Sequence, residues 1–321
     1  MRRPKGWIGC LGLCLALVLS AGCELQESTI VDVEDVVVAE VYVELGQGLF
    51  GQNRVIAFLH RTVGGLAPGF SEVPGARIAL IRADGSTFEF AEASIQTCAA
   101  TLPVEGTGSC YWLAPALSAQ INPGDPLELT IALPGGGVLR SATVVPGDFG
   151  VIGIAEGAQC VLPPETTMEV MWSTSQGAWA YINETAISGI QAALVPLGIE
   201  VDADPLVLLG LGVSASDTTI IFPGEFGIFN RFELDQALAN LLQEGLPAGT
   251  RARVTISAAD RNYVNWVRGG NFNPSGQVRV PSMVGDGTGV FAAAVTRTFE
   301  VVVDPDSHGG LYSVPACLVN P

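Results

Sequence analysis

The stretch that decides the fold class runs from Pro126 to Val145 and reads PLELTIALPGGGVLRSATVV. Its first half alternates apolar residues with polar or small ones, the period of two that a half-buried β-strand requires. The apolar set is Leu127, Leu129, Ile131 and Leu133, and the intervening set is Glu128, Thr130 and Ala132. Three glycines then turn the chain, and residues 138–145 return as a second strand. The stretch predicts a β-hairpin in an antiparallel sheet.

Strand patterns of the same kind precede this hairpin. Apolar residues alternate over 37–43, a second strand is expected at 54–61, and a further hairpin at 76–90. At the tip of that hairpin, Asp84-Gly85 is expected to supply the positive φ angles of a type I′ turn. Several short strands with regular turn signals are typical of a sandwich. We therefore expect an Ig-like β-sandwich over residues 36–148.

The second region, residues 149–304, mixes strand and helix patterns. A helix is expected from Asn230 as N-cap, with Glu233 as its capping-box partner, through a leucine stripe that ends at Gly245. Shorter helices are expected at Asn183–Leu194 and Asp260–Arg268. Strands are expected at Thr167–Trp172, Ala178–Ile182, Leu206–Leu211, Thr218–Phe222, Arg251–Ser257 and Phe291–Val303. The predicted fold is mainly β: an N-terminal Ig-like β-sandwich, then a second β-rich α+β domain with a few helices, and a C-terminal tail at 305–321.

The first residues carry the pattern of an export signal. Arg2, Arg3 and Lys5 precede an apolar run, 7–19, that is too short for a membrane span of about 20 residues, and small residues then lead to Cys23. The ending Leu-Ser-Ala-Gly-Cys resembles the lipobox of bacterial lipoproteins. It implies a signal peptide at 1–22, cleavage before Cys23, and lipid on that cysteine. An ordinary secretory signal is the alternative.

Lipidation would fix the location of the mature chain. Several acyl chains on Cys23 anchor a protein stably to a bilayer surface, and residues 23–35 would form an acidic tether. In the lipoprotein resemblance, an Asp after the cysteine marks retention in the inner membrane, and here Glu24 stands in that place. We therefore expect the outer membrane, on its periplasmic or its surface face.

The net charge and the number of cysteines limit which partners and which kinds of site the mature protein can have. Removal of the signal leaves 12 arginines against 32 acidic residues, a formal charge of −20 that repels nucleic acid and anionic lipid surfaces. Four cysteines then remain, which allow three disulfide pairings. We favour Cys98–Cys110 and Cys160–Cys317. A zinc site is the alternative, but no C-x-x-C spacing occurs and only His60 and His308 are available.

Candidate site residues fall into two groups. Tyr263 and Trp266, beside the glycine-rich 269–276 segment, are the candidates for a carbohydrate or peptide site, since aromatic faces stack on sugar rings; packing is the alternative role for such residues. No cofactor is expected. Calcium is the ion that acidic loops would suit, and its candidate ligands are Asp202, Asp204, Asp304 and Asp306, with Asp286 behind them. None has the spacing of an EF-hand loop, so solvated loops are the first interpretation.

A set of turn and strand motifs resembles one known family. The lipobox, residues 36–43, Pro74-Gly75-Ala76-Arg77-Ile78 before an Asp-Gly turn, and Pro123-Gly124-Asp125-Pro126-Leu127 are similar to bacterial lipoproteins with the domain of unknown function 4249. Tyr263 and the segment Gly287-Thr288-Gly289-Val290-Phe291 look like that family's C-terminal pattern. The resemblance implies an anchored Ig-like or transthyretin-like sandwich associated with outer-membrane transport systems of the TonB-dependent kind. It brings no catalytic residues.

Three functions compete at this point. The first is a non-enzymatic, membrane-anchored lipoprotein of the cell envelope that acts as a binding or accessory module for an envelope or outer-membrane partner protein or ligand. The second is a secreted hydrolase with its site in the second domain, although no G-x-S-x-G motif accompanies His60 or His308. The third is a structural envelope protein. We expect no catalytic residues, and hence not an enzyme.

Overall fold

The computed structural model describes residues 35–46, 53–62, 72–98, 109–212, 214–224, 236–269, 279–304 and 316–318. Strands predominate over these ranges, so the prediction of a mainly β fold is confirmed. The strands of the first half are β1 (Val37–Gly46), β2 (Arg54–Arg61), β3 (Arg77–Arg82), β4 (Thr87–Glu89), β5 (Ala91–Ala93), β6 (Ser109–Trp112), β7 (Pro126–Leu133) and β8 (Gly137–Val144). Those of the second half are β9 (Gln159–Leu162), β10 (Met168–Met171), β11 (Ala180–Ser188), β12 (Leu206–Leu211), β13 (Thr219–Phe222), β14 (Arg251–Ala259), β15 (Val284–Gly285), β16 (Thr288–Val303) and β17 (Ala316–Leu318). The helices are α2 (Ile95–Cys98), α3 (Pro115–Ser118), α4 (Ile190–Leu194), the 3₁₀ helix η1 (Val195–Leu197), α5 (Gln236–Glu244) and α6 (Arg261–Gly269).

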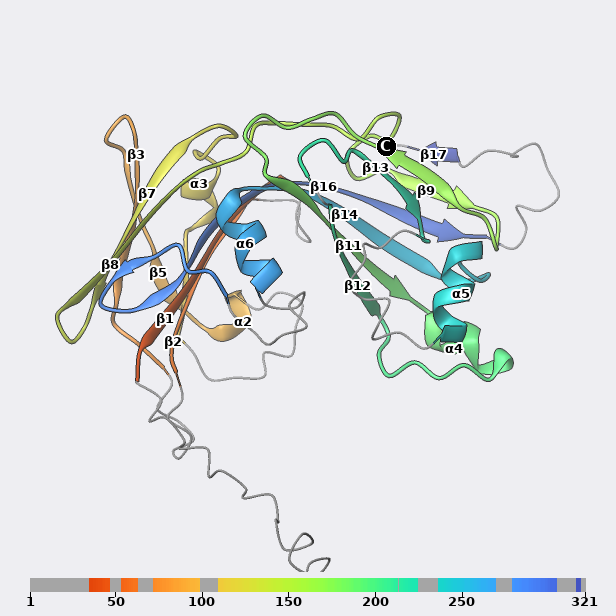
Figure 1. The fold of residues 1–321 in the computed structure, drawn as a ribbon, viewed down its shortest axis with the longest axis horizontal. Helices are drawn as coiled ribbons and strands as arrows, with labels where there is room; N and C mark the ends of the chain where they lie inside the picture. Colours follow the sequence, from red (N-terminus) through yellow and green to blue (C-terminus); the bar gives the residue numbers. More distant parts are fainter. Residues whose placement is uncertain are drawn as a thin grey trace, which may run out of the picture. The chain divides into compact units, whose positions relative to one another are not determined.

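The larger sheet is organised around β16, which is sixteen residues long. Its main path has the order β12-β11-β14-β16-β1-β2-β6-β5, and β9 and β17 complete its ten strands. β14 pairs antiparallel along one edge of β16, whereas β1 and β9 share the other edge, both parallel to it. Figure 1 shows β16 in blue between β1 and β14. Strand β16 therefore connects β1, the first described strand, to β14 and β9 in the second half of the chain.

A second sheet faces part of the first and makes the predicted sandwich. It has five strands in the order β15-β8-β7-β3-β4, at the left of Figure 1. The hairpin of residues 126–145 is β7–β8, paired from Pro126↔Val144 to Leu133↔Gly137. Inward side chains of the two sheets fill one core, among them Val41, Leu59, Leu80, Leu129, Ile131 and Leu139, none more than 1% exposed. The β-sandwich prediction is confirmed in this two-sheet arrangement.

Shorter elements cover the remaining inner face of the larger sheet. β10 and β13 form a two-stranded sheet, and Val170, Phe222 and Leu242 from β10, β13 and α5 belong to the same buried cluster as Val41 and Leu129. The core is thus continuous from the sandwich to the helices of the second half.

The expected division between 148 and 149 differs from what the structure contains. Residues 35–321 form one compact unit. β1, before that boundary, pairs with β16, after it, over nine residue pairs, and the apolar core also crosses it. The turn signals at 146–148 mark the end of a strand, and the pairing across the boundary joins residues about 250 positions apart, which no local pattern encodes.

The predicted type I′ turn at the tip of the β3–β4 hairpin is corrected. Gly85 has a φ of +86°, but Asp84 is not left-handed, so the turn is not type I′. Instead, the Gly85 N–H donates to the Arg82 carbonyl and the Arg82 N–H to the Ser86 carbonyl, both at 2.9 Å. This is the longer loop that ends in a left-handed glycine.

The helix predictions have mixed outcomes. The expected helix Asn183–Leu194 is wrong over its first part, because Ala180–Ser188 is strand β11 and only Ile190–Leu194 is α-helical. The inward residues of β11 include Asn183 and Thr185, which are 4% and 0% exposed, and these polar residues hide the period of two. α5 and α6 form where helices were expected, and Gly245 follows α5. The predicted N-cap Asn230 and its partner Glu233 lie outside the described residues.

Candidate functional site

Helix α6 brings both predicted aromatic residues onto the outer face of the larger sheet. The helix starts after Asp260 because the carboxylate of Asp260 accepts the Tyr263 N–H at 2.8 Å, an N-cap bond. Val264 packs on Ala180 and Ile182 of β11. Trp266 packs on the other side, against Val290 and Ala292 of β16.

The rings of Tyr263 and Trp266 are used in packing. Tyr263 lies against Tyr42 of β1, with ring centroids 5.5 Å apart. Trp266 is 7% exposed, and the Arg279 guanidinium lies over its ring at 4.6 Å from the centroid. Arg279 also pairs with Glu40 at 3.2 Å. A sugar ring needs an open aromatic face, so this geometry favours the packing role for both residues over the stacking role.

Burial also removes the tyrosines from acid–base chemistry. Desolvation is the largest cause that raises the pKa of Tyr42 and of Tyr263. The carboxylate of Glu44 raises both pKa values further, and that of Glu40 raises the pKa of Tyr42. Both hydroxyls therefore stay neutral at physiological pH, and neither is an activated base or nucleophile.

Asp260, at the start of this helix, is the carboxyl group there whose pKa burial shifts. It is 5% exposed, and burial raises the pKa of its carboxyl to about 6 against the opposing hydrogen bonds from Thr143 and Tyr263. The Thr143 hydroxyl donates to one of its oxygens while the Tyr263 N–H donates to the other. The sequence predicts Asp260 only as a helix start; its burial depends on Thr143 of β8, which only the fold brings to it.

A cavity in the described part of the chain lies on the outer face of the smaller sheet. Its volume is about 560 Å³, and its walls come from the ends of β3, β7 and β8. Ile81, Glu128 and Ala142 are one cross-strand row, and they point outward because the alternating residues, such as Leu80 and Leu129, are buried. The remaining lining residues are Arg82, Ala83, Gly85, Pro126, Leu127, Thr143 and Val144.

Glu128 gives this cavity its charge. Its side chain is exposed, and no hydrogen bond or ion pair joins it to another residue in the described ranges. Around it, Ile81, Pro126 and Val144 supply apolar surface, and Val144 is 54% exposed. The cavity is thus an apolar surface with one available carboxylate, which suits a group that combines a positive charge with an apolar stem.

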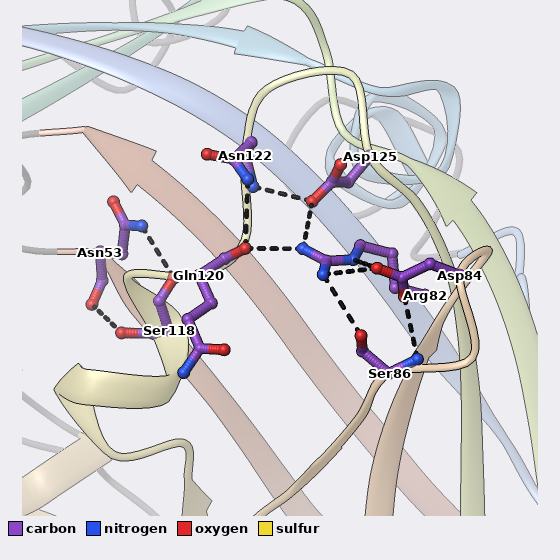
Figure 2. Close-up of polar contacts among 8 residues, drawn as sticks. All are labelled: Asn53, Arg82, Asp84, Ser86, Ser118, Gln120, Asn122 and Asp125. Carbon is purple, nitrogen blue, oxygen red and sulfur yellow. Dashed lines mark hydrogen bonds and ion pairs between the residues drawn. The ribbon is translucent and has the colours of Figure 1, made fainter.

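Arg82, at the rim of the cavity, is already neutralised. It pairs with Asp84 at 2.7 Å and with Asp125 at 3.6 Å, and it donates to the Gln120 carbonyl at 2.9 Å. Figure 2 shows the guanidinium between the β3–β4 hairpin and the 120–125 loop. The bonds from Arg82 and Ser86 hold the pKa of Asp84 well below its usual range. Arg82 therefore fixes the cavity wall and leaves Glu128 as its available charge.

Two of the predicted calcium ligands, Asp204 and Asp286, accept backbone hydrogen bonds. Asp204 accepts the backbone N–H of Gly189 at 2.9 Å and that of Gln191 at 3.4 Å, at the start of α4. Asp202 is exposed, and Asp304 follows β16. Asp306 lies outside the described residues, and Asp286 accepts the Val138 N–H. Within the part of the chain that the structure describes, no three His, Cys, Asp or Glu side chains are grouped to hold a metal ion.

Both favoured disulfides are present. Cys98 is bonded to Cys110, and Cys160 to Cys317. The first lies under β2 with Ile56, and the second joins β17 to β9. Cys23 and His308 lie outside the described residues, and the Nδ1 atom of His60 is 3.4 Å from the carbonyl oxygen of Arg61. No helix in the described ranges has the length and apolar character to cross a membrane.

Comparisons with known proteins do not show a family for this chain. No protein-family model and no curated protein matches the chain. A crystal structure described as Dpr11 IG1 bound to DIP-gamma IG+IG2 is 8% identical, covers 84% of this chain and 98% of its own, and has a TM-score of 0.19. A DUF4785 family protein from Legionella pneumophila is 9% identical, covers 68% of this chain and 51% of its own, and has a TM-score of 0.20. At these scores the likenesses carry no argument, and the resemblance to the domain of unknown function 4249 stays a prediction.

Proposed function

We propose that this protein is a lipid-anchored accessory module of the outer membrane, which binds a partner protein or ligand and catalyses no reaction. The observation that carries the proposal is the combination of a lipobox-type signal ending at Cys23 with two disulfides in the folded unit. Disulfides form and persist outside the cytoplasm, and a lipobox places the chain there by a separate mechanism. The two features support the same compartment independently.

The binding role is supported by how the reactive groups are used. Asp260 caps a helix, Tyr42 and Tyr263 pack with raised pKa values, and Arg82 is held by two carboxylates. The cavity beside Arg82 joins an apolar surface to the carboxylate of Glu128, a combination that binds rather than reacts. The proposed partner presents a basic residue with an apolar stem at this cavity, and the resemblance stated above points to an outer-membrane transport protein.

Substitution of Cys23 tests the anchor. Cys23→Ala is expected to abolish the incorporation of labelled palmitate and to move the protein from the membrane to the soluble fraction. Cys14→Ala is the matched control, because Cys14 lies in the apolar part of the signal and outside the lipobox. Membrane retention and palmitate labelling of the Cys23 variant equal to wild type would contradict the proposal.

The partner site is tested separately by reversing one charge. Glu128→Arg is expected to remove the neighbour that crosslinks to the wild-type protein in cells, whereas Glu89→Arg, an exposed residue of β4 outside the cavity, keeps it. The competing hydrolase function is tested on purified protein with esterase, glycosidase and peptidase substrates. Reproducible turnover would contradict the non-enzymatic role.

A further inference from the structure

Strand β12 is the one long strand at an end of the two large sheets in the described ranges. It has six residues and terminates the ten-stranded sheet, whereas the other end strands, β4, β5, β15 and β17, have two or three residues each. Short edge strands are a common device that prevents unwanted pairing. β12 lacks that device, and its sequence, LVLLGL, also lacks charged residues and proline.

The backbone groups that point outward from β12 can be identified. The Gly212 N–H donates to the Tyr181 carbonyl at 2.7 Å, and the register from Ile182↔Leu211 to Ile187↔Leu206 is unbroken. Hydrogen-bonded pairs alternate along an antiparallel ladder. The residues at even positions, 206, 208 and 210, therefore bond to β11. The N–H and C=O groups of Val207, Leu209 and Leu211 point away from it, and none bonds to another described residue.

The side chains beside these groups form a graded apolar strip. Leu211 is 5% exposed and packs on Ala180, Ile182 and Val264, Leu209 is partly buried against the same cluster, and Val207 is 45% exposed. A strand added at this edge would continue the apolar outer face of the sheet. Main-chain bonds would hold such a strand, and alternate side-chain contacts would select it.

Charge around the edge indicates what the added strand carries. From β11 to the end of the described 214–224 segment, residues 184–224 carry five acidic residues, Glu184, Glu200, Asp202, Asp204 and Asp217, and no basic residue. Glu200 and Asp202 are exposed just before β12, and Glu184 is exposed on β11. A second copy of the chain would bring the same negative charge to the edge, and like charges repel. A segment with basic residues at its ends is instead complementary.

We propose that the edge of β12 binds an extended segment of a partner protein, apolar at alternate positions and flanked by lysine or arginine, which adds to the sheet as a further strand. The inference rests on the proposed binding role but does not depend on the lipid anchor. It concerns a different surface from the cavity around Glu128.

The test uses the full-length protein and a labelled peptide, Lys-Lys-Val-Thr-Val-Thr-Val-Lys-Lys, followed by fluorescence anisotropy. Saturable binding with a dissociation constant below about 1 mM is expected, and exchange of the four lysines for glutamates is expected to weaken binding at least ~10-fold. Methylation of alternate peptide nitrogens removes the N–H groups on one side of a strand. One of the two alternate sets should abolish binding and the other should preserve it.

Two protein variants complete the test. Val207→Lys places a charge at the edge on an exposed side chain and is expected to weaken binding at least ~10-fold. Val195→Lys, in η1 and 70% exposed, is the control that keeps binding. Leu209→Pro removes one outward N–H without the loss of a ladder bond and should act like Val207→Lys.

Several results would overturn the inference. They include no saturable binding up to about 1 mM, equal binding of both methylated peptides, and equal binding by the Val207→Lys and Val195→Lys variants. A dimer in solution that Val207→Lys dissociates would also overturn it, because it would make a second copy of the chain the occupant. Loss of the Cys23 anchor leaves all these readouts in place, and loss of crosslinking in Glu128→Arg leaves peptide binding unchanged. Failure of the inference and failure of the proposed function are therefore distinguishable.

Discussion

Asp260→Asn is expected to stabilise the protein at neutral pH. Burial raises the folded-state pKa of Asp260 from 3.8 to about 6, about two units, and each unit corresponds to about 1.4 kcal/mol. The ionised carboxylate therefore costs the folded state about 3 kcal/mol above pH 7. Asparagine keeps an oxygen for the Tyr263 N–H and an amide that donates to the Thr143 hydroxyl, so the cap survives. It forfeits about 0.5–1 kcal/mol of helix-dipole interaction, which leaves a net gain of about 2 kcal/mol.

The size of this effect depends on pH in a defined window. Because the folded-state pKa is raised, the contribution of Asp260 is fully present below its unfolded value near 4 and is lost as the pH rises through about 6. Urea unfolding of both proteins at several pH values measures the difference, which should grow from near zero at pH 4 to about 2 kcal/mol at pH 8. Asp84→Asn is the opposite control, since the pKa of Asp84 is lowered and its loss destabilises at high pH. A variant of Asp260 that is less stable than wild type at pH 8, or a difference that does not depend on pH, would refute the reasoning.

Two further predictions concern the sheet and its crosslink. Gly289→Ala is expected to lower the free energy of unfolding by about 3 kcal/mol or more, because φ is +136° and the new Cβ would collide with the Ala39 carbonyl oxygen of β1. Gly75→Ala, at a φ of +76° with open space around it, should lower it by only about 1 kcal/mol. Equal losses of the two variants in urea unfolding would argue against the β1–β16 pairing. Replacement of both Cys98 and Cys110 by serine removes a crosslink between residues 12 positions apart and should lower the free energy of unfolding by about 3 kcal/mol. A variant with an unchanged urea midpoint would show that this bond adds no stability.

The strands could be predicted where one face is uniformly apolar. β7 shows this, because Leu127, Leu129 and Ile131 are all buried while Glu128 is exposed, and the period is legible in the sequence. β11 could not be predicted in full, because its inward face includes Asn183 and Thr185. A polar residue in a core position removes the contrast on which the pattern depends.

Long-range pairing was beyond local patterns. The strands β1 and β16 were each expected, but their parallel pairing depends on the fit of Ala39 against Gly289, which only the folded chain brings together. For the same reason, the punctuation at 146–148 suggested a domain boundary where the sheet and core are continuous. The cysteine pairing could be predicted, because its alternatives were few.

The candidate site was predicted only in part. Tyr263 and Trp266 were correctly placed on one helix, but whether an aromatic face is open or covered depends on residues such as Arg279 and Tyr42, which are distant in sequence. Glu128 was recognised only as the polar face of a strand. The cavity around it arises from the ends of three strands, and no spacing within one strand signals it.

The N-terminus of the mature protein is the most direct test of the central claim, that this is a lipid-anchored module outside the cytoplasm. Mass spectrometry of the protein extracted from cell membranes is expected to find a chain that begins at Cys23 and carries acyl groups on that residue. An unmodified chain that retains residues 1–22 and fractionates with the cytoplasm would contradict the account.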